Sequence, residues 1–279
     1  MGLGGYLTWT ATAREIYKRE GNLNLKMLPC EIHGNRITRI VQSEIFEKNP
    51  LFSFREPNSK IFYLQLNNPL ANYCKKDTPQ KAYHQCDKHI IEQVCEYYGI
   101  NKPELKCELY FSDEQRKKAD KLIKKINKDF IIIEPHSKMN YTPNRAYPFE
   151  KWQNIIDEVS KHIQVVQVGQ KGNEVLSGVT DFTGKTSFKE ATLLIGKSKL
   201  FISAEGGLVH AATATNTNSV VVMTGYQDMR MVAYPQNVNI NIANHGPCGL
   251  KILCENCQKD AENHDYKIVV DKVLESLYA

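Results

Sequence analysis

Strand-like and helix-like segments alternate regularly along the second half of the chain. Four apolar runs have the composition of buried strands: FIIIEP (130–135), IQVVQVG (163–169), KLFISAE (199–205) and SVVVMTG (219–225). Helical patterns separate them, one around Trp152, one over 188–197 and a short one over 207–216. This order requires crossover connections, so it predicts a parallel sheet with helices on both faces.

The first half indicates a second, more irregular α/β unit. We predict strands over 25–31, 60–66 and 106–111, helices over 10–19 and 87–98, and a lysine-rich helix from Ser112 or Asp113 to about residue 127. A chain of 279 residues has the length of two ordinary domains. We therefore predict an α/β protein with one lobe over 1–120, a second over 121–279 and a cleft between them.

Composition and charge narrow the classes of protein to which the chain can belong. With 42% hydrophobic and 24% charged residues the chain is globular, and no apolar run approaches the roughly 20 residues of a membrane-spanning helix. The N-terminus lacks the pattern of a signal peptide, so we expect a soluble, cytoplasmic protein. The net charge of +5 is a mild excess, and its densest basic runs lie on one predicted helix. We expect no nucleic-acid partner, whereas a weak attraction to phosphorylated substrates or to anionic lipid, as in peripheral contact with an inner membrane, stays open.

The loops after the predicted strands hold the candidate site, because ligands of open parallel sheets bind beyond the carboxyl ends of the strands. Gly206 and Gly207 stand between a strand and a helix, where backbone N–H groups can approach an anion. Glu205 can accept hydrogen bonds from sugar hydroxyls. His210 either reaches a phosphate or lies inside the fold.

Two further loops have an anion-binding and a structural interpretation each. Arg145 stands shortly before a helix opened by Pro148, where a guanidinium beside a helix dipole suits a diphosphate. The alternative is a solvated loop arginine. The segment TGKTS (183–187) resembles a phosphate loop without the P-loop spacing, and capping of the next helix through Thr186 or Ser187 is its alternative role.

Cysteines gather near the end of the chain. Cys248, Cys254 and Cys257 follow the pattern C-x5-C-x2-C, and C-x2-C is a metal-ligand spacing. With His264 or His245 as a fourth ligand they can form a tetrahedral structural site. Reduced thiols in a surface hairpin are the alternative.

Several of these motifs occur together in a familiar order. The order is a glycine-rich N-terminal loop (2–7), Arg145 to Trp152, a strand ending in Gly169, DFTGKTSFKEA (181–191), the segment 205–212 and PCGL with further cysteines (247–257). In this order the chain resembles glycosyltransferase family 9, the heptosyltransferase family of bacterial lipopolysaccharide assembly.

The resemblance implies a GT-B fold, in which two Rossmann-like lobes with parallel sheets face a cleft. It implies a nucleotide-sugar donor such as ADP-heptose, and a glycan, glycolipid or protein as acceptor. It also implies catalysis that needs no metal cofactor, because side chains and a helix dipole stabilise the departing diphosphate. A related autotransporter heptosyltransferase group carries an iron-binding cysteine finger, so zinc or iron are the candidate structural metals at the C-terminal cysteines.

The family motifs map residue by residue. The family's donor-phosphate lysine maps onto Arg145, its acidic residue at a strand end onto Glu205, and the following Gly and His onto Gly207 and His210. The glycine segment would then face Gly206 and Gly207 across the cleft, unless it is a disordered terminus. The donor site expected in this way comprises Gly4, Gly5, His136, Arg145, Gly169, Thr183, Gly184, Glu205, Gly206, Gly207, Leu208 and His210.

The chain also departs from the family pattern. Gly5 stands where many members have the Asp proposed as the catalytic base. His84, Asp87 and His89 are candidates in its place, although Asp87 equally suits a helix cap. The strand that usually precedes the glycine segment is missing, so we expect a reduced or altered first lobe. Two alternative functions follow: a GT-B nucleotide-sugar epimerase or hydrolase, or a non-catalytic nucleotide-sugar-binding member of the family.

Overall fold

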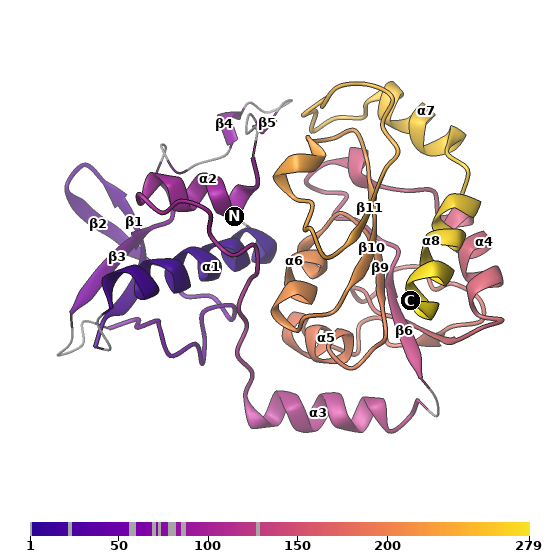
Figure 1. Ribbon diagram of the computed structural model, residues 1–279, viewed down its shortest axis with the longest axis horizontal. Helices are drawn as coiled ribbons and strands as arrows, with labels where there is room; N and C mark the ends of the chain where they lie inside the picture. The colour runs from indigo at the N-terminus through magenta and orange to yellow at the C-terminus, as the bar shows by residue number, and fades with distance from the viewer. Residues whose placement is uncertain are drawn as a thin grey trace.

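Two groups of elements lie side by side in the computed structural model (Figure 1). The structure describes residues 2–21, 24–55, 60–68, 71, 74–77, 82–84, 88–126 and 129–279, with the backbone alone over 74–77 and 82–84. We call the part up to residue 126 the first half and the part from residue 129 the second half. Helix α3 (Asp113–Ile123) runs along one edge of both groups and leads from one to the other.

The second half is built on a six-stranded parallel sheet with the order β11-β10-β9-β6-β7-β8. Its strands are β6 (Phe130–Glu134), β7 (Gln164–Gln167), β8 (Thr180–Asp181), β9 (Phe201–Ala204), β10 (Ser219–Met223) and β11 (Val238–Asn241). The four strands expected from apolar runs are confirmed. Two further strands were not predicted: β8, which is two residues long, and β11, whose residues alternate between apolar and polar.

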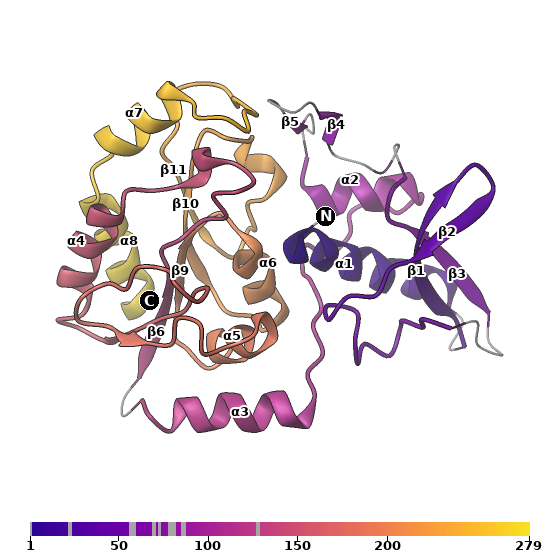
Figure 2. The same ribbon diagram turned by 180° about the vertical axis from the view of Figure 1, so that it is seen from behind.

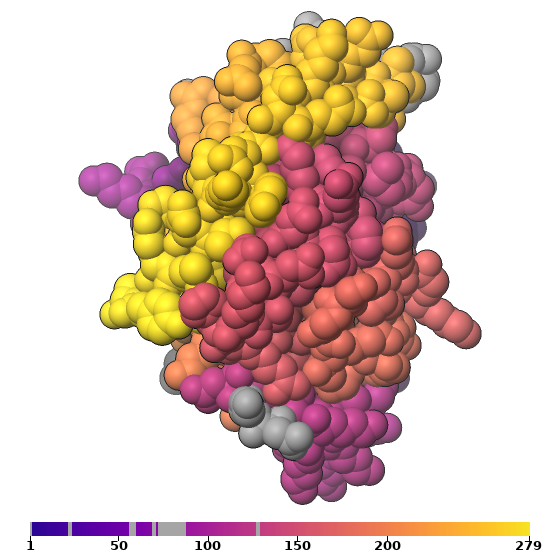
Figure 3. All heavy atoms as spheres, turned by 90° about the vertical axis from the view of Figure 1, so that its right-hand side faces the viewer, coloured from indigo at the N-terminus to yellow at the C-terminus, as the bar shows by residue number. Residues whose placement is uncertain are grey.

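Helices cover both faces of this sheet (Figures 1 and 2). They are α4 (Phe149–Val159), α5 (Phe188–Ile195), α6 (Gly207–Ala214), α7 (Glu255–Asn263) and α8 (Lys267–Tyr278). Successive strand residues point to opposite faces, so Ile131 shares one core with Trp152 of α4 and Val269 of α8, while Ile132 shares another with Leu208 of α6. Figure 3 shows the outer face, where the C-terminal segment lies against the segment that contains α4.

The first half holds a smaller, mixed sheet. Strand β1 (Lys26–His33) pairs antiparallel with β2 (Arg36–Ile40) and parallel with β3 (Ile61–Gln65). Strand β4 (Cys74–Asp77) pairs antiparallel with β5 (Ala82–His84), and α2 (Ile90–Tyr97) follows later in the chain. The expected Rossmann-like parallel sheet is therefore reduced in the described part of this half. The predicted boundary between residues 120 and 121 falls inside α3, and the division into two functional lobes stays a prediction.

Two expectations for the first half are wrong. The predicted strand over 106–111 forms no sheet pairs; instead the N–H of Cys107 donates to Thr213 of α6 and the N–H of Glu108 donates to Thr10. The glycine segment is the first turn of a helix, α1 (Leu3–Glu20), and not a loop. Helix α1 is buried along 7–14 and packs against α6 of the second half, in both views of the fold. Among the described residues, no helix has the length and apolar character to cross a membrane.

Candidate active site

A cavity of about 600 Å³ opens between the two halves at the carboxyl ends of β6, β9 and β10. The first half contributes the start of α1, with Gly2, Gly4 and Gly5, and Ile90 of α2. The second half contributes the loops that follow its strands. Of the predicted donor site, the residues that line this cavity are Gly4, Gly5, His136, Arg145, Glu205, Gly206, Gly207, Leu208 and His210.

The N-termini of two helices meet at this cavity. Helix α1 begins after Gly2 and α6 after Gly206, and no described side chain caps either end. The two helices approach closely, because a Cβ on Gly4 would lie 3.0 Å from the Cα of Gly207. The first N–H groups of a helix have no partner inside it, and the helix dipole places partial positive charge there. The convergence therefore forms a site suited to an anion.

Arg145 supplies a full positive charge beside these helix ends. Its Nε lies 2.5 Å from Oε1 of Glu205, and its Nη2 donates to Gln227 at 3.3 Å. The guanidinium also lies 4.7 Å from the ring centroid of Tyr226 and 5.5 Å from that of Tyr141. These contacts hold the cation in place, with 20% of its side chain exposed on the cavity side of the loop.

Glu205 and His210 are both shielded from water. Burial raises the pKa of Glu205, although the charge of Arg145 and a hydrogen bond from Gln227 oppose the shift. Burial and the nearby charge of Arg145 lower the pKa of His210 to about 4, so this ring is neutral at pH 7. Its Nδ1 lies 2.7 Å from the hydroxyl of Tyr234. The ion pair with Glu205 thus orients Arg145. The ring of His210 lies next to Gly4, where α1 approaches the start of α6.

Glu134 is a site residue that the sequence analysis missed. It ends β6, lines the cavity and is half-buried. Burial raises the pKa of its carboxyl to about 8. The signal was present in the sequence, because Glu134 directly follows the apolar run FIII just as Glu205 follows its own strand.

Three predicted donor residues lie beside the cavity instead of lining it. The N–H of Gly184 donates to the carbonyl of Gly169, and Gly184 has a φ of +69°. A Cβ there would come within 2.9 Å of Lys171, which explains the glycine. A Cβ on Gly169 would lie 3.0 Å from Oδ1 of Asn173, and Asn173 does line the cavity. The N–H of Thr183 donates to the carboxylate of Asp181. The contacts of Thr183 and Gly184 thus fix the shape of the loop before α5. Ser187 caps α5, as expected.

The structure describes only some of the remaining predicted residues. His136 lines the cavity, with Nε2 2.8 Å from the carbonyl of Glu174 and its ring stacked on Phe149. Asp87 lies outside the described residues, as does the side chain of His84, whose backbone belongs to β5. The cap of α2, which we considered for Asp87, is His89.

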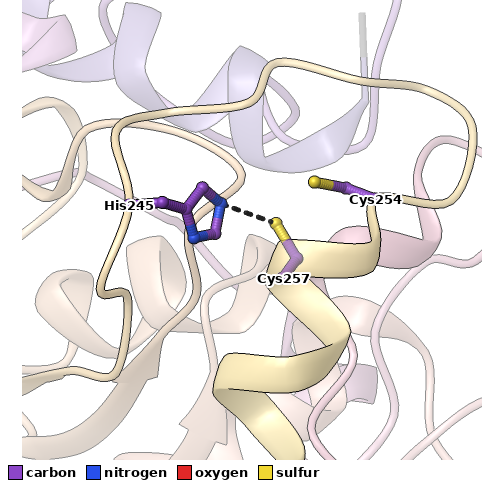
Figure 4. A group of neighbouring side chains, drawn as sticks. All are labelled: His245, Cys254 and Cys257. Atoms are coloured by element: carbon purple, nitrogen blue, oxygen red, sulfur yellow. Dashed lines mark hydrogen bonds between the residues drawn. The ribbon is translucent and has the colours of Figure 1, made fainter.

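The C-terminal cysteines form a compact cluster with a histidine (Figure 4). The ligand atoms of His245, Cys254 and Cys257 lie within 4.8 Å of one another. Sγ of Cys248 lies 3.5 Å from that of Cys257, whose hydrogen bond lowers the pKa of the Cys248 thiol to about 6. Of the two histidines considered as a fourth ligand, His245 lies beside the thiols, whereas Nδ1 of His264 lies 2.9 Å from the hydroxyl of Tyr147.

The donor set fits a metal ion. Nδ1 of His245 lies 2.6 Å from Asp260, which holds the ring so that Nε2 points to Cys257, 3.4 Å away. Three thiols and an imidazole with a carboxylate behind it are typical of tetrahedral zinc or iron sites.

Asn144 connects this cluster to Arg145. Its side-chain amide donates to the carbonyls of Leu250 and Ile252, and its oxygen accepts from the N–H of Cys254, at 2.8, 2.8 and 2.9 Å. Asn144 is buried and directly precedes Arg145 in the same short 3₁₀ turn (Pro143–Arg145). The fold of the cysteine segment therefore helps to set the position of the cavity arginine.

Comparison with known proteins agrees with the fold. The model of glycosyltransferase family 9 (heptosyltransferase) matches residues 70–259. The lipopolysaccharide core heptosyltransferase OpsX of Haemophilus influenzae is 26% identical over 187 residues, which cover 62% of this chain and 50% of OpsX. The chain thus spans about half the length of the curated relative that it matches.

Two solved structures align over the whole chain. The glycosyltransferase family 9 protein of Veillonella parvula has a TM-score of 0.67 at 11% identity, with 95% of its own length covered. The iron-containing dodecameric glycosyltransferase TibC of enterotoxigenic Escherichia coli has a TM-score of 0.65 at 15% identity, with 74% of its length covered. The fold is thus that of the GT-B glycosyltransferases. The chain belongs to glycosyltransferase family 9, the heptosyltransferase family.

Proposed function

We propose that the chain is a glycosyltransferase that binds the diphosphate of a nucleotide-sugar donor in the cavity between α1 and α6. The observation that carries this proposal is the convergence of two uncapped helix N-termini and Arg145 on one cavity. A diphosphate there would accept hydrogen bonds from first-turn N–H groups of both helices. Because the helices belong to different halves, such a ligand would also hold the halves together.

The same groups supply the chemistry of transfer. As the bond between the anomeric carbon and the diphosphate oxygen breaks, negative charge grows on the leaving group. Arg145 and the helix ends are already in place to stabilise that charge, so no metal is required for this step. His210, neutral at pH 7, adds no charge of its own beside the leaving group.

We propose ADP-heptose as the donor and a lipopolysaccharide-type glycan as the acceptor. Support comes from the relatives: OpsX is a lipopolysaccharide core heptosyltransferase, and TibC has been solved in complex with ADP-D-β-D-heptose. A cytoplasmic enzyme with peripheral membrane contact would meet such an acceptor at the inner membrane.

We further propose that His245, Cys248, Cys254 and Cys257 hold a structural zinc or iron ion. The ion would stabilise the segment that Asn144 anchors and would take no part in sugar transfer. TibC, which shares the fold, is an iron-containing protein.

The experiment follows ADP-heptose by mass spectrometry, with and without a heptose-deficient lipopolysaccharide acceptor. The proposal predicts donor consumption that depends on the acceptor, and a product heavier by one heptose. Efficient donor loss without acceptor would favour the epimerase or hydrolase alternative. Nucleotide binding without turnover in any acceptor extract would favour the non-catalytic alternative.

A further inference from the structure

The described part of the first half offers no ionisable side chain to the cavity. It contributes Gly2, Leu3, Gly4, Gly5 and Ile90 only. Transfer of a sugar to a hydroxyl group needs a base to remove the hydroxyl proton as the oxygen attacks. Among the described residues, any side chain of the cavity wall that can act as this base therefore belongs to the second half.

Most ionisable groups there are engaged. The carboxylate of Glu205 is paired with Arg145. Nδ1 of His210 lies 2.7 Å from the hydroxyl of Tyr234, and burial leaves that ring a weak base. Nε2 of His136 lies 2.8 Å from the carbonyl of Glu174. Among the described residues, the carboxylate of Glu134 has no hydrogen-bond or ion-pair partner.

Glu134 also stands in the right place. It is the last residue of β6, in register with Ser203 of the neighbouring strand β9, two residues before Glu205. Its Oε2 would lie 3.9 Å from a Cβ on Gly206, the residue at the N-terminus of α6. A sugar joined to a diphosphate at this helix end would have its reacting carbon near this carboxylate.

We propose that Glu134 is the general base of sugar transfer, a role that rests on the proposed glycosyltransferase function. Glu134 takes the proton of the acceptor hydroxyl as its oxygen forms a bond to the anomeric carbon. The bond between that carbon and the diphosphate oxygen breaks, and its electron pair leaves with the nucleoside diphosphate. The proton on Glu134 then passes to solvent through the open side of the cavity.

The half-burial of Glu134 has a measurable consequence. Burial raises the pKa of its carboxyl to about 8, so the basic form gains population as the pH rises through 8. The other titratable or charged groups on the cavity wall are His136, Lys138 and Tyr141 from the loop after β6, Arg145 from the 3₁₀ turn, Glu205 just before α6 and His210 within α6. The rate of transfer should therefore rise between pH 7 and 9 with an inflection near 8.

The test compares wild type with Glu134→Gln, which keeps the shape of the side chain and removes the base. The control is Glu158→Gln, which removes an exposed carboxylate on α4 that pairs with Lys161. Three quantities are measured for each protein: the affinity for ADP by calorimetry, kcat with ADP-heptose and acceptor, and the dependence of kcat on pH. A circular dichroism melt checks that each variant is folded.

The expected result for Glu134→Gln is an ADP affinity within about threefold of wild type, a kcat lower by about 100-fold or more, and no inflection near pH 8. Glu158→Gln should match wild type in all three. A folded Glu134→Gln variant with wild-type kcat, or with its pH inflection intact, overturns the role of Glu134 alone. A wild-type protein that binds ADP and transfers no sugar overturns the proposed function and this role together.

Discussion

Gly4 at the start of α1 and Gly207 at the start of α6 touch across the boundary between the two halves. A Cβ on Gly4 would come within 3.0 Å of the Cα of Gly207 and 3.1 Å of Cδ2 of His210. The absence of both side chains lets two helix N-termini share one cavity. A larger residue at either position would separate the groups that we propose to bind the diphosphate.

Gly4→Ala should weaken ADP binding by tenfold or more. The added methyl group meets backbone at Gly207 and the ring of His210, so α6 must shift, at a cost of about 1–3 kcal/mol for overpacking. The melting temperature should fall by a few degrees. The control is Lys18→Ala, which changes an exposed residue of the same helix. An ADP affinity unchanged in Gly4→Ala would show that the approach of α1 to α6 is not part of the site.

Arg145→Ala should lower kcat/KM for the donor by about 30- to 1,000-fold, equivalent to about 2–4 kcal/mol of transition-state stabilisation. The substitution removes the cation beside the leaving diphosphate. It also leaves the buried carboxylate of Glu205 without its ion-pair partner. Steady-state kinetics measure the effect. Arg39→Ala, on the exposed strand β2, is the matched control, and equal activity of the two variants would remove Arg145 from the mechanism.

Glu134→Gln should be more stable than wild type at pH 8 and equal to it near pH 4. The ordinary pKa of a glutamate is 4.5, and burial raises that of Glu134 to about 8 in the folded protein. Between these values the folded state binds more protons than the unfolded state, so the stabilising contribution of this group is complete below pH 4.5 and is lost as the pH rises through 8. Thermal melts from pH 4 to 9 measure it. A constant difference across this range would contradict the raised pKa.

Loss of the proposed structural metal should weaken nucleotide binding indirectly. Cys257→Ser should abolish binding of the proposed zinc or iron ion, loosen the segment anchored by Asn144, and lower the melting temperature. Because Asn144 adjoins Arg145, we also expect a reduced ADP affinity. Metal analysis, thermal melts and calorimetry report the three effects, with Gln258→Ala, an exposed neighbour on α7, as control. A protein purified without metal, with a melt like that of Cys257→Ser, would argue against the metal site.

The sequence predicted the second half well because its strands are buried on both faces. A run such as FIIIE is continuous and unmistakable, and the loops that follow such strands contain Arg145, Glu205 and Gly207. The first half was harder. Its strand β2 is exposed along its whole length, so it lacks an apolar pattern. The segment over 106–111, expected to be a strand, instead donates backbone hydrogen bonds to Thr10 of α1 and Thr213 of α6.

The glycine segment shows a different limit. Three glycines within residues 2–5 favour a loop by intrinsic propensity, yet they form the N-cap and first turn of α1. What favours the helix is tertiary packing, because only glycine lets α1 approach Gly207. Likewise, spacing left His245 and His264 open as ligands, and only the fold, through Asp260 and Tyr147, assigns them different partners.

Calorimetric titration with ADP, AMP and adenosine tests the claim that two helix N-termini and Arg145 bind a diphosphate. The claim predicts that affinity depends on the phosphates, with ADP binding at least tenfold more tightly than AMP, and AMP more tightly than adenosine. It also predicts that Arg145→Ala removes most of the difference between ADP and AMP. Equal affinity for the three ligands, or an ADP preference that survives in Arg145→Ala, would contradict diphosphate binding by these groups.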